Sequence, residues 1–176
     1  MLCCVFSRPR KLDSEEELYD VALRALMRRA HSVHEMKQKL ARRTNNELLI
    51  RVVMARLKEN GQLDDERYAQ QFTRNRTQSR KQGKFRIARE LRVRGVPDRV
   101  IHSVLGESDG QTDQAAMVRE RIERKVKSYR GEIDDRKIAS IYGSLLRAGF
   151  PSDLVRKELK RLTQEGVAVA EVEEEL

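Results

Sequence analysis

The same short turn occurs twice in this chain, and each copy joins two short helical segments. Gly95-Val96-Pro97 follows an apolar stripe that begins with Ile87-Ala88, and Gly149-Phe150-Pro151 follows a stripe that begins with Ile138-Ala139. In each turn the glycine permits a left-handed backbone that ends one helix, and the proline presets φ for the start of the next. An internal repeat of this kind predicts several copies of one small helical unit.

The middle of the chain is the clearest copy of that unit, with three short helices and almost no loop between them. Gly61 is expected to end the preceding helix, and the carboxylates of Asp64 and Asp65 to cap the next one. Apolar residues then recur at spacings of three and four, which is typical of helices with one buried face. The three stripes are made by Tyr68, Ala69 and Phe72, by Ile87, Ala88 and Leu91, and by Val100, Ile101, Val104 and Leu105.

The same plan predicts three helices before this unit and three after it. The S-x-x-E capping box occurs at Ser14–Glu17 and again at Ser32–Glu35. The polar stretch 106–111 is the candidate linker to the last unit. The residues expected to be buried include Leu18, Ala22, Met36, Leu40, Val53 and Leu57 before the middle unit, and Val118, Ile122, Ile141, Leu145 and Leu159 after it.

These patterns predict an all-α protein, an elongated tandem array of three three-helix repeats. The few β-branched residues lie at helical spacing and only 5% of the residues are aromatic, so no strand is expected. The expected boundaries are 1–13 for a flexible N-terminal arm, 14–61 for repeat 1, 62–106 for the basic repeat 2, 107–165 for repeat 3, and 166–176 for an acidic disordered tail.

Composition favours small units in a reducing compartment. Charged residues make up 37% of the chain and the mean hydropathy is −0.72, which suits units with much surface per residue. The sequence contains neither a run of eighteen apolar residues nor the apolar segment of a signal peptide, so we expect a soluble, cytoplasmic protein. The adjacent Cys3 and Cys4 are expected to be plain thiols rather than a lipid anchor, and they cannot form a disulfide framework.

The net charge of +9 is concentrated in the first two-thirds of the chain. Residues 21–63 contain 10 Lys or Arg against 3 Asp or Glu, and residues 64–105 contain 11 against 5. Residues 106–176 contain 13 against 15 and are therefore slightly acidic. This polarity predicts an anionic partner for the front of the protein.

The basic side chains of the middle unit are the candidate binding residues. Glu90 is the only acidic residue between Arg67 and Val96, so we expect the positive charges to lack the acidic partners of an ordinary solvated helix surface. Arginine, the commoner cation here, also suits bidentate contact with phosphate or carboxylate. We predict partner or DNA binding by Arg74, Arg76, Arg80, Lys81, Lys84, Arg86, Arg89 and Arg92; a merely solvated surface is the alternative.

No motif for catalysis or for a cofactor is present. The chain lacks G-x-x-x-x-G-K-[ST], G-x-G-x-x-G after a strand, C-x-x-C and H-E-x-x-H. His31 and His34 lie beside Glu35, but two histidines in a first turn without a third strong ligand favour a solvated helix start over a metal site. We therefore predict no catalytic residue, no metal, no cofactor and no enzymatic activity, which also argues against a nuclease.

A set of caps, turns and core positions in the first two units forms a distinctive pattern, made of His31, Ser32, Glu35, Leu40, Gly61, Leu63, Asp64, Asp65, Arg67, Tyr68, Ala69, Phe72, Arg74, Arg76, Gly83, Arg86, Ile87, Glu90, Leu91, Arg94, Gly95 and Val96. With this pattern the chain resembles the RecX family, small regulators of the bacterial RecA recombinase, over about residues 18–162. The family usually has an aromatic residue where this chain has Gln62, and a Gly-x-Gly-Pro turn where it has Gln82-Gly83-Lys84-Phe85. Neither difference breaks a cap or a stripe, so the fold is expected to survive.

The resemblance implies a function that involves no covalent chemistry. It implies a RecX-like regulator of DNA repair, homologous recombination and the SOS response. Such a regulator lies along the groove of a RecA filament on single-stranded DNA, or at its growing end, and lowers filament growth, ATP hydrolysis and strand exchange. The implied partners are the RecA filament and, weakly or within it, single-stranded DNA, with no membrane and with the protein as a monomer.

A helix-turn-helix regulator that reads duplex DNA is the main alternative. Short helices joined by a Gly-Val-Pro turn, with arginines on the second helix, suit that class. Asn and Gln, which read bases specifically, are scarce on that helix and count against this alternative.

Overall fold

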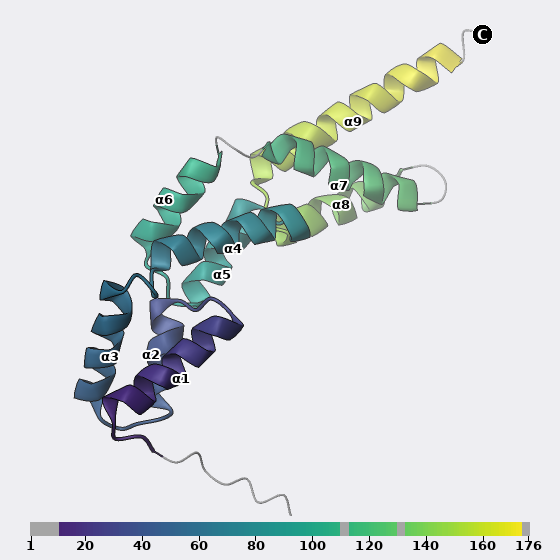
Figure 1. Cartoon of the computed structure of the whole chain (residues 1–176). Coiled ribbons are helices and arrows are strands. Elements are labelled where there is room, and N and C mark those ends of the chain that lie inside the picture. Colours follow the sequence, from purple (N-terminus) through teal and green to yellow (C-terminus); the bar gives the residue numbers. More distant parts are fainter. Residues whose placement is uncertain (1–10, 110–112, 130–132, 174–176) are drawn as a thin grey trace, which may run out of the picture. The chain divides into compact units, whose positions relative to one another are not determined.

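The computed structural model describes residues 11–109, 113–129 and 133–173, and within them the side chains except those of residues 108–109 and 163–173. This part of the chain is helical and contains no strand, so the predicted all-α class is confirmed (Figure 1). The helices are α1 (Glu15–Arg28), α2 (Val33–Ala41), α3 (Glu47–Glu59), α4 (Asp65–Arg80), α5 (Lys84–Val93), α6 (Asp98–Asp109), α7 (Gln114–Ser128), α8 (Asp135–Arg147) and α9 (Ser152–Glu173). None of them is long and apolar enough to cross a membrane.

The chain divides into two compact units. Unit 1 contains the described residues up to Gln71 together with Leu91–Ile101, and unit 2 contains Phe72–Glu90 together with the described residues from His102 onward. The division passes through α4, α5 and α6, so each of these helices contributes one end to each unit. Because it follows contacts and not the sequence repeat, the repeat boundaries stay predictions.

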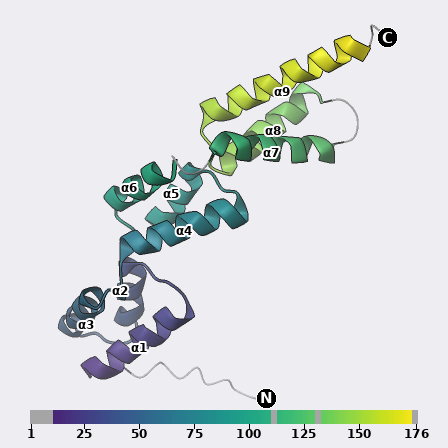
Figure 2. The ribbon, with the colours of Figure 1, turned by 45° about the horizontal axis from the view of Figure 1, so that its top comes forward.

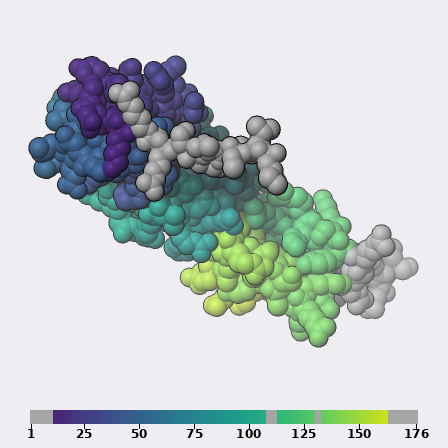
Figure 3. Space-filling model, turned by 90° about the horizontal axis from the view of Figure 1, so that it is seen from below, coloured from purple at the N-terminus to yellow at the C-terminus, as the bar shows by residue number. Residues whose placement is uncertain are grey.

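Helices α1, α2 and α3 pack against one another around the apolar core of unit 1 (Figure 2). The stripes predicted for these helices are confirmed, because every member that the sequence placed in the core is shielded from solvent. In the space-filling view the purple and blue atoms of this part of the chain pack closely (Figure 3). The fully buried core residues are Leu18, Ala22, Met36, Leu40, Val53 and Leu57.

The two predicted capping boxes differ in the structure. The Ser32 hydroxyl accepts a hydrogen bond from the Glu35 backbone N–H (3.1 Å) and so caps α2, but the Glu35 carboxylate pairs with Arg29 (2.9 Å) instead of returning to the cap. At α1 the prediction is wrong, because the Ser14 hydroxyl donates to the carboxylate of Glu16 (2.8 Å) and caps no backbone group. A hydrogen bond to a charged carboxylate is stronger than one from a neutral amide, and α1 begins with three glutamates.

Helices α7, α8 and α9 pack around the apolar core of unit 2. The first turn of α5 is fixed to the turn between α8 and α9, since the backbone N–H of Gly83 donates to Ala148 (2.9 Å) and that of Phe85 donates to Gly149 (3.0 Å). A Cβ atom at residue 83 would collide with the Gly149 carbonyl group, so only glycine permits this approach. The buried residues of this core include Val118, Ile122, Ile141, Leu145, Phe150 and Leu159.

The repeated turn has the predicted geometry in both copies. Gly95 has φ +72° and Gly149 has φ +92°, values that favour glycine, and each residue ends a helix. A side chain at residue 95 would also overlap the His34 ring, and one at residue 149 would overlap Arg86. The turn therefore depends on glycine both for its backbone and for its packing.

Three segments differ from the expectation or lie partly outside the described residues. The predicted linker 106–111 is helical as far as Asp109, and the stretch 166–173, expected as disordered tail, continues α9. Of the predicted flexible arm, residues 1–10 with Cys3 and Cys4 lie outside the described part, while the Leu12 N–H donates to the Arg43 carbonyl (2.8 Å).

Gln62, which stands where the family pattern usually has an aromatic residue, forms a hydrogen bond within unit 1. The Tyr19 hydroxyl donates a hydrogen bond to the Gln62 side-chain carbonyl (2.8 Å), and the Asn60 amide donates to the same hydroxyl (3.1 Å). The guanidinium of Arg56 lies over the Tyr19 ring, 4.1 Å from its centre. A polar network thus occupies this end of unit 1.

Candidate functional site

The eight basic residues predicted to bind a partner lie on α4, on the turn after it and on α5. Seven of them belong to unit 2, and Arg92 belongs to unit 1. The expectation that their charges lack acidic partners is wrong for at least four of them. The paired residues are Arg76, Lys81, Arg86 and Arg92.

Glu90 holds two of these arginines and so links α4 to α5 within unit 2. Its carboxylate lies 3.1 Å from the Arg76 guanidinium and 3.2 Å from Arg86 Nε, and it accepts a hydrogen bond from the Gln82 amide (3.3 Å). Burial by itself raises the pKa of Glu90, but the bond from Arg86 and the charge of Arg76 outweigh it and hold the pKa below its usual value. Arg76 also lies over the Phe72 ring, 4.7 Å from its centre. The one acid in this stretch therefore neutralises two cations.

The other two pairs use acids outside the stretch that the sequence argument counted. Lys81 Nζ lies 3.9 Å from the Glu120 carboxylate on α7, and Arg92 Nε lies 2.6 Å from the Asp98 carboxylate. Both pairs are substantially exposed and contribute little to stability. A charge count limited to residues 67–96 misses both acids, because Asp98 lies just beyond that segment and Glu120 reaches Lys81 through a tertiary contact.

Arg74, Arg80 and Arg89 are the exposed cations that remain from the predicted set. In the part of the chain that the structure describes, none of the three forms an ion pair, and each side chain is open to solvent. They lie on α4 and α5 of unit 2. These three arginines, called the exposed triad below, stay the predicted contact residues.

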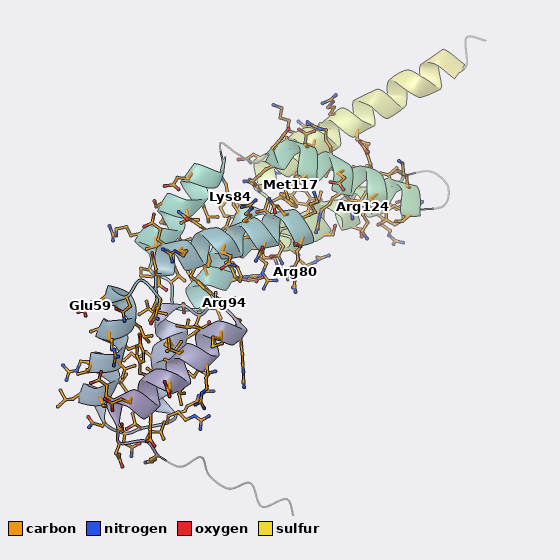
Figure 4. The ribbon with its side chains drawn as sticks, viewed as in Figure 1. Glu59, Arg80, Lys84, Arg94, Met117 and Arg124 are labelled. Carbon is orange, nitrogen blue, oxygen red and sulfur yellow. The ribbon has the colours of Figure 1, made fainter. Side chains whose placement is uncertain are left out.

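Further cations of unit 2 were missed by the sequence argument. Arg121 donates from its guanidinium to the Arg80 carbonyl at the end of α4 (3.1 Å), which brings α7 beside that end. Figure 4 shows Arg80 on α4 and Arg124 on the neighbouring α7. Their segment was passed over because residues 106–176 are slightly acidic as a whole. The signal that identifies them is the spacing of Arg121, Arg124 and Lys125, which places three cations on one helical face.

The two histidines at the start of α2 differ, because His31 is buried whereas His34 is exposed on the first turn. His31 is only 5% exposed, and its Nδ1 lies 2.9 Å from the Arg29 carbonyl. Burial is the main cause that lowers the pKa of His31 and favours the neutral ring. His34 lies against Gly95 and its Nε2 is 2.9 Å from the Gln38 amide. The expectation of a solvated helix start is therefore wrong for His31.

The acidic and hydroxyl residues of the pattern form contacts between the helices of unit 1. Asp65 accepts a hydrogen bond from the Val33 N–H (2.8 Å), so it caps α2 in addition to opening α4. Burial raises the pKa of Asp65, against the effect of that bond. The Ser32 hydroxyl donates to the Arg94 carbonyl (2.6 Å). Among the described residues no three His, Asp or Glu side chains are grouped as metal ligands.

Known proteins match this chain along most of its length. Two sequence models, described as the first and the second three-helix domain of RecX, match residues 19–57 and 64–105. The curated protein named Regulatory protein RecX from Halorhodospira halophila is 42% identical over 144 residues, which are 81% of this chain and 86% of that protein. The chain belongs to the RecX family. Another family member, from Trichlorobacter lovleyi, is 31% identical over 142 residues, 80% of this chain and 92% of its own length.

Solved RecX structures share this fold. The crystal structure of RecX from Lactobacillus salivarius superposes with a TM-score of 0.77 at 22% identity, covering 85% of this chain and 97% of that one. A second RecX crystal structure gives a TM-score of 0.71 at 19% identity, covering 81% and 71%. The sequence matches confirm the resemblance to the RecX family, and these structures show that the fold is shared.

Proposed function

We propose that this RecX protein is a non-enzymatic, cytoplasmic regulator of the RecA recombinase. In this proposal it binds as a monomer along the RecA filament on single-stranded DNA and inhibits filament growth, ATP hydrolysis and strand exchange. The observation that carries the proposal is the 42% identity to a protein named Regulatory protein RecX over most of both chains. The recombinase as target, and inhibition as outcome, come from the family resemblance.

The small size of each helical unit suits binding through several weak contacts. A helix rises about 1.5 Å per residue, so the 16-residue α4 is only ~24 Å long. One helical unit therefore meets a small part of a filament, and its affinity alone is low. Once one unit is bound, a second unit of the same chain is held at a high effective concentration near its own site. The whole protein therefore binds more tightly than one unit alone.

The exposed triad supplies cations for such contacts. Arg74, Arg80 and Arg89 are open to solvent and unpaired within the described residues, so their guanidinium groups need not leave an internal partner to bind. Guanidinium groups bind phosphate and carboxylate with two parallel hydrogen bonds. Both groups are present where DNA lies within a protein filament.

The direct test is a titration of the purified protein into RecA and single-stranded DNA, with ATP hydrolysis and filament length measured together. The proposal expects both to fall as the protein is added. Unchanged hydrolysis and length at saturating protein contradict it. Duplex DNA with varied sequence serves as the second arm, since a helix-turn-helix regulator predicts one preferred duplex site whereas a filament regulator predicts none.

A further inference from the structure

A groove on the surface of unit 2 is lined by cations and by no carboxylate. It lies between α7 and α8, has a volume of about 370 Å³, and is called the α7–α8 groove below. Its cations come from one face of α7 and its other wall from α8. The lining residues are Arg121, Arg124, Lys125, Ser128, Ser144 and Leu145.

Arg121 is a half-buried cation whose hydrogen-bonding groups are only partly used. One terminal nitrogen donates to the Arg80 carbonyl (3.1 Å), while the buried Nε has no hydrogen-bond partner among the described residues. Burial is the first cause that lowers the pKa of Arg121, followed by the positive charges of Arg124 and Arg86. An arginine held among other cations with an unused N–H is a site that an anion would stabilise.

The acids near the groove do not balance its charge. Glu120 is the acidic neighbour, 4.0 Å from the Arg124 guanidinium and 3.9 Å from Lys81 Nζ, and more than half of its side chain is exposed. Exposed pairs at such distances are weak and screened by salt. Glu120 is also shared between two cations, so the groove keeps an excess of positive charge.

We propose that the α7–α8 groove binds the phosphate groups of a single-stranded nucleic acid. Arg121, Arg124 and Lys125 fall within about 6 Å along the axis of α7, since each residue rises 1.5 Å. A ligand that pairs with three cations over so short a distance carries a negative charge on every monomer. A phosphodiester chain meets this condition. Arginine forks and lysine are the side chains that most often contact such a backbone.

The size of the groove favours one strand over a duplex. A volume of about 370 Å³ is in the range of small-ligand pockets and admits a flexible backbone, whereas a rigid duplex meets only the rim. Ser128 on α7 and Ser144 on α8 add small polar side chains to the two sides of the groove. The inference uses unit 2 alone and does not require the recombinase.

The test measures binding of the full-length protein to a labelled single-stranded oligonucleotide by fluorescence anisotropy in a salt series. The double variant R124Q/K125Q removes two groove cations whose side chains are exposed, so folding is preserved. The matched control K127Q/R136Q removes one lysine and one arginine that are exposed and do not line the groove. The inference expects about ten-fold weaker binding for the groove variant, the loss of about 1.4 kcal/mol. The slope of log affinity against log salt should also fall by ~1.4, because each single-strand phosphate contact contributes about 0.7.

Several outcomes would overturn the inference. If both double variants lose the same affinity for the oligonucleotide, the effect comes from net charge and not from the groove. If duplex DNA binds as tightly as the single strand, the groove is not specific for single strands. Full competition by a glutamate-rich peptide at equal charge assigns the groove to an acidic protein instead. S128E, which adds a carboxylate at the groove without removing a cation, should weaken binding with unchanged circular dichroism, and unaltered binding by it contradicts the proposal. Because RecA is absent from every arm, failure here leaves the ATPase test of the proposed function unaffected, and the reverse also holds.

Discussion

Replacing Glu90 by Gln should destabilise unit 2 although it changes only one side-chain atom and leaves the helices intact. Glu90 receives Arg76 at 3.1 Å, Arg86 at 3.2 Å and the Gln82 amide at 3.3 Å, and only 21% of its side chain is exposed. A neutral amide cannot neutralise two guanidinium groups. Its NH₂ group also faces one of them, so two hydrogen-bond donors point at each other. Loss of charge-assisted hydrogen bonds at a largely buried position costs about 1–3 kcal/mol. For a chain of this size that corresponds to a decrease in Tm of roughly 2–12 °C.

Lowering the pH should remove the stabilisation that the Glu90 carboxylate provides, and the direction of this effect follows from its pKa. The pKa of Glu90 is lowered in the folded protein, so the unfolded chain binds a proton more readily. The stabilisation is therefore complete above the unfolded glutamate pKa of about 4.3 and is lost as the pH falls through the lower folded value. The stability difference between the natural chain and E90Q should shrink over that range.

The assay is urea unfolding followed by circular dichroism at neutral pH and at several acidic pH values. E123Q is the matched control, because Glu123 is exposed on α7 and forms no ion pair within the described residues. Equal unfolding midpoints for E90Q, E123Q and the natural chain at neutral pH would refute the reasoning. A difference that stays constant down to the lowest pH would also refute it.

Other predictions concern backbone and packing, and each is checked by the same unfolding measurement. K81G should raise stability by about 0.5–1 kcal/mol, because Lys81 has a φ of +50° that glycine adopts without strain; a lower midpoint contradicts this. G83A should cost about 1–3 kcal/mol, because the new Cβ collides with the backbone of Gly149, whereas G106A meets no atom within 4 Å in its helix and should be neutral or stabilising; equal effects contradict the packing argument. Stability should also fall as the pH drops below about 6.5, since burial lowers the pKa of His31 and the unfolded chain takes up the proton first; a variant H31N that keeps the same slope contradicts this assignment.

Sequence reasoning predicts the helices well because their causes are local. Apolar residues at spacings of three and four define the buried faces of α1, α2 and α3, and each Gly-apolar-Pro turn requires a left-handed glycine that the structure contains. The cap at Ser14 was mispredicted because a nearby carboxylate competes for the same hydroxyl. That competition depends on rotamers that the sequence does not specify.

The candidate site was only partly predictable because its contacts join residues that are far apart in the sequence. Lys81 is paired with Glu120, which is thirty-nine positions further along the chain, so counting within one stretch left it unpaired. The α7–α8 groove requires α7 to lie beside both α8 and the end of α4, and the contact of Arg121 with Arg80 spans 41 positions. The helical spacing of its cations is visible in the sequence, but their shared groove is not.

The measurement that tests the central claim most directly compares three proteins as inhibitors of RecA ATP hydrolysis on single-stranded DNA. They are the natural chain, the variant R74Q/R80Q/R89Q that removes the exposed triad, and the charge-matched control K127Q/R136Q/K157Q. The account predicts that the natural chain and the control lower ATP hydrolysis alike, while the triad variant, with the same helicity, needs a markedly higher concentration to do so. A natural chain without effect, or a triad variant as potent as the control, would contradict it.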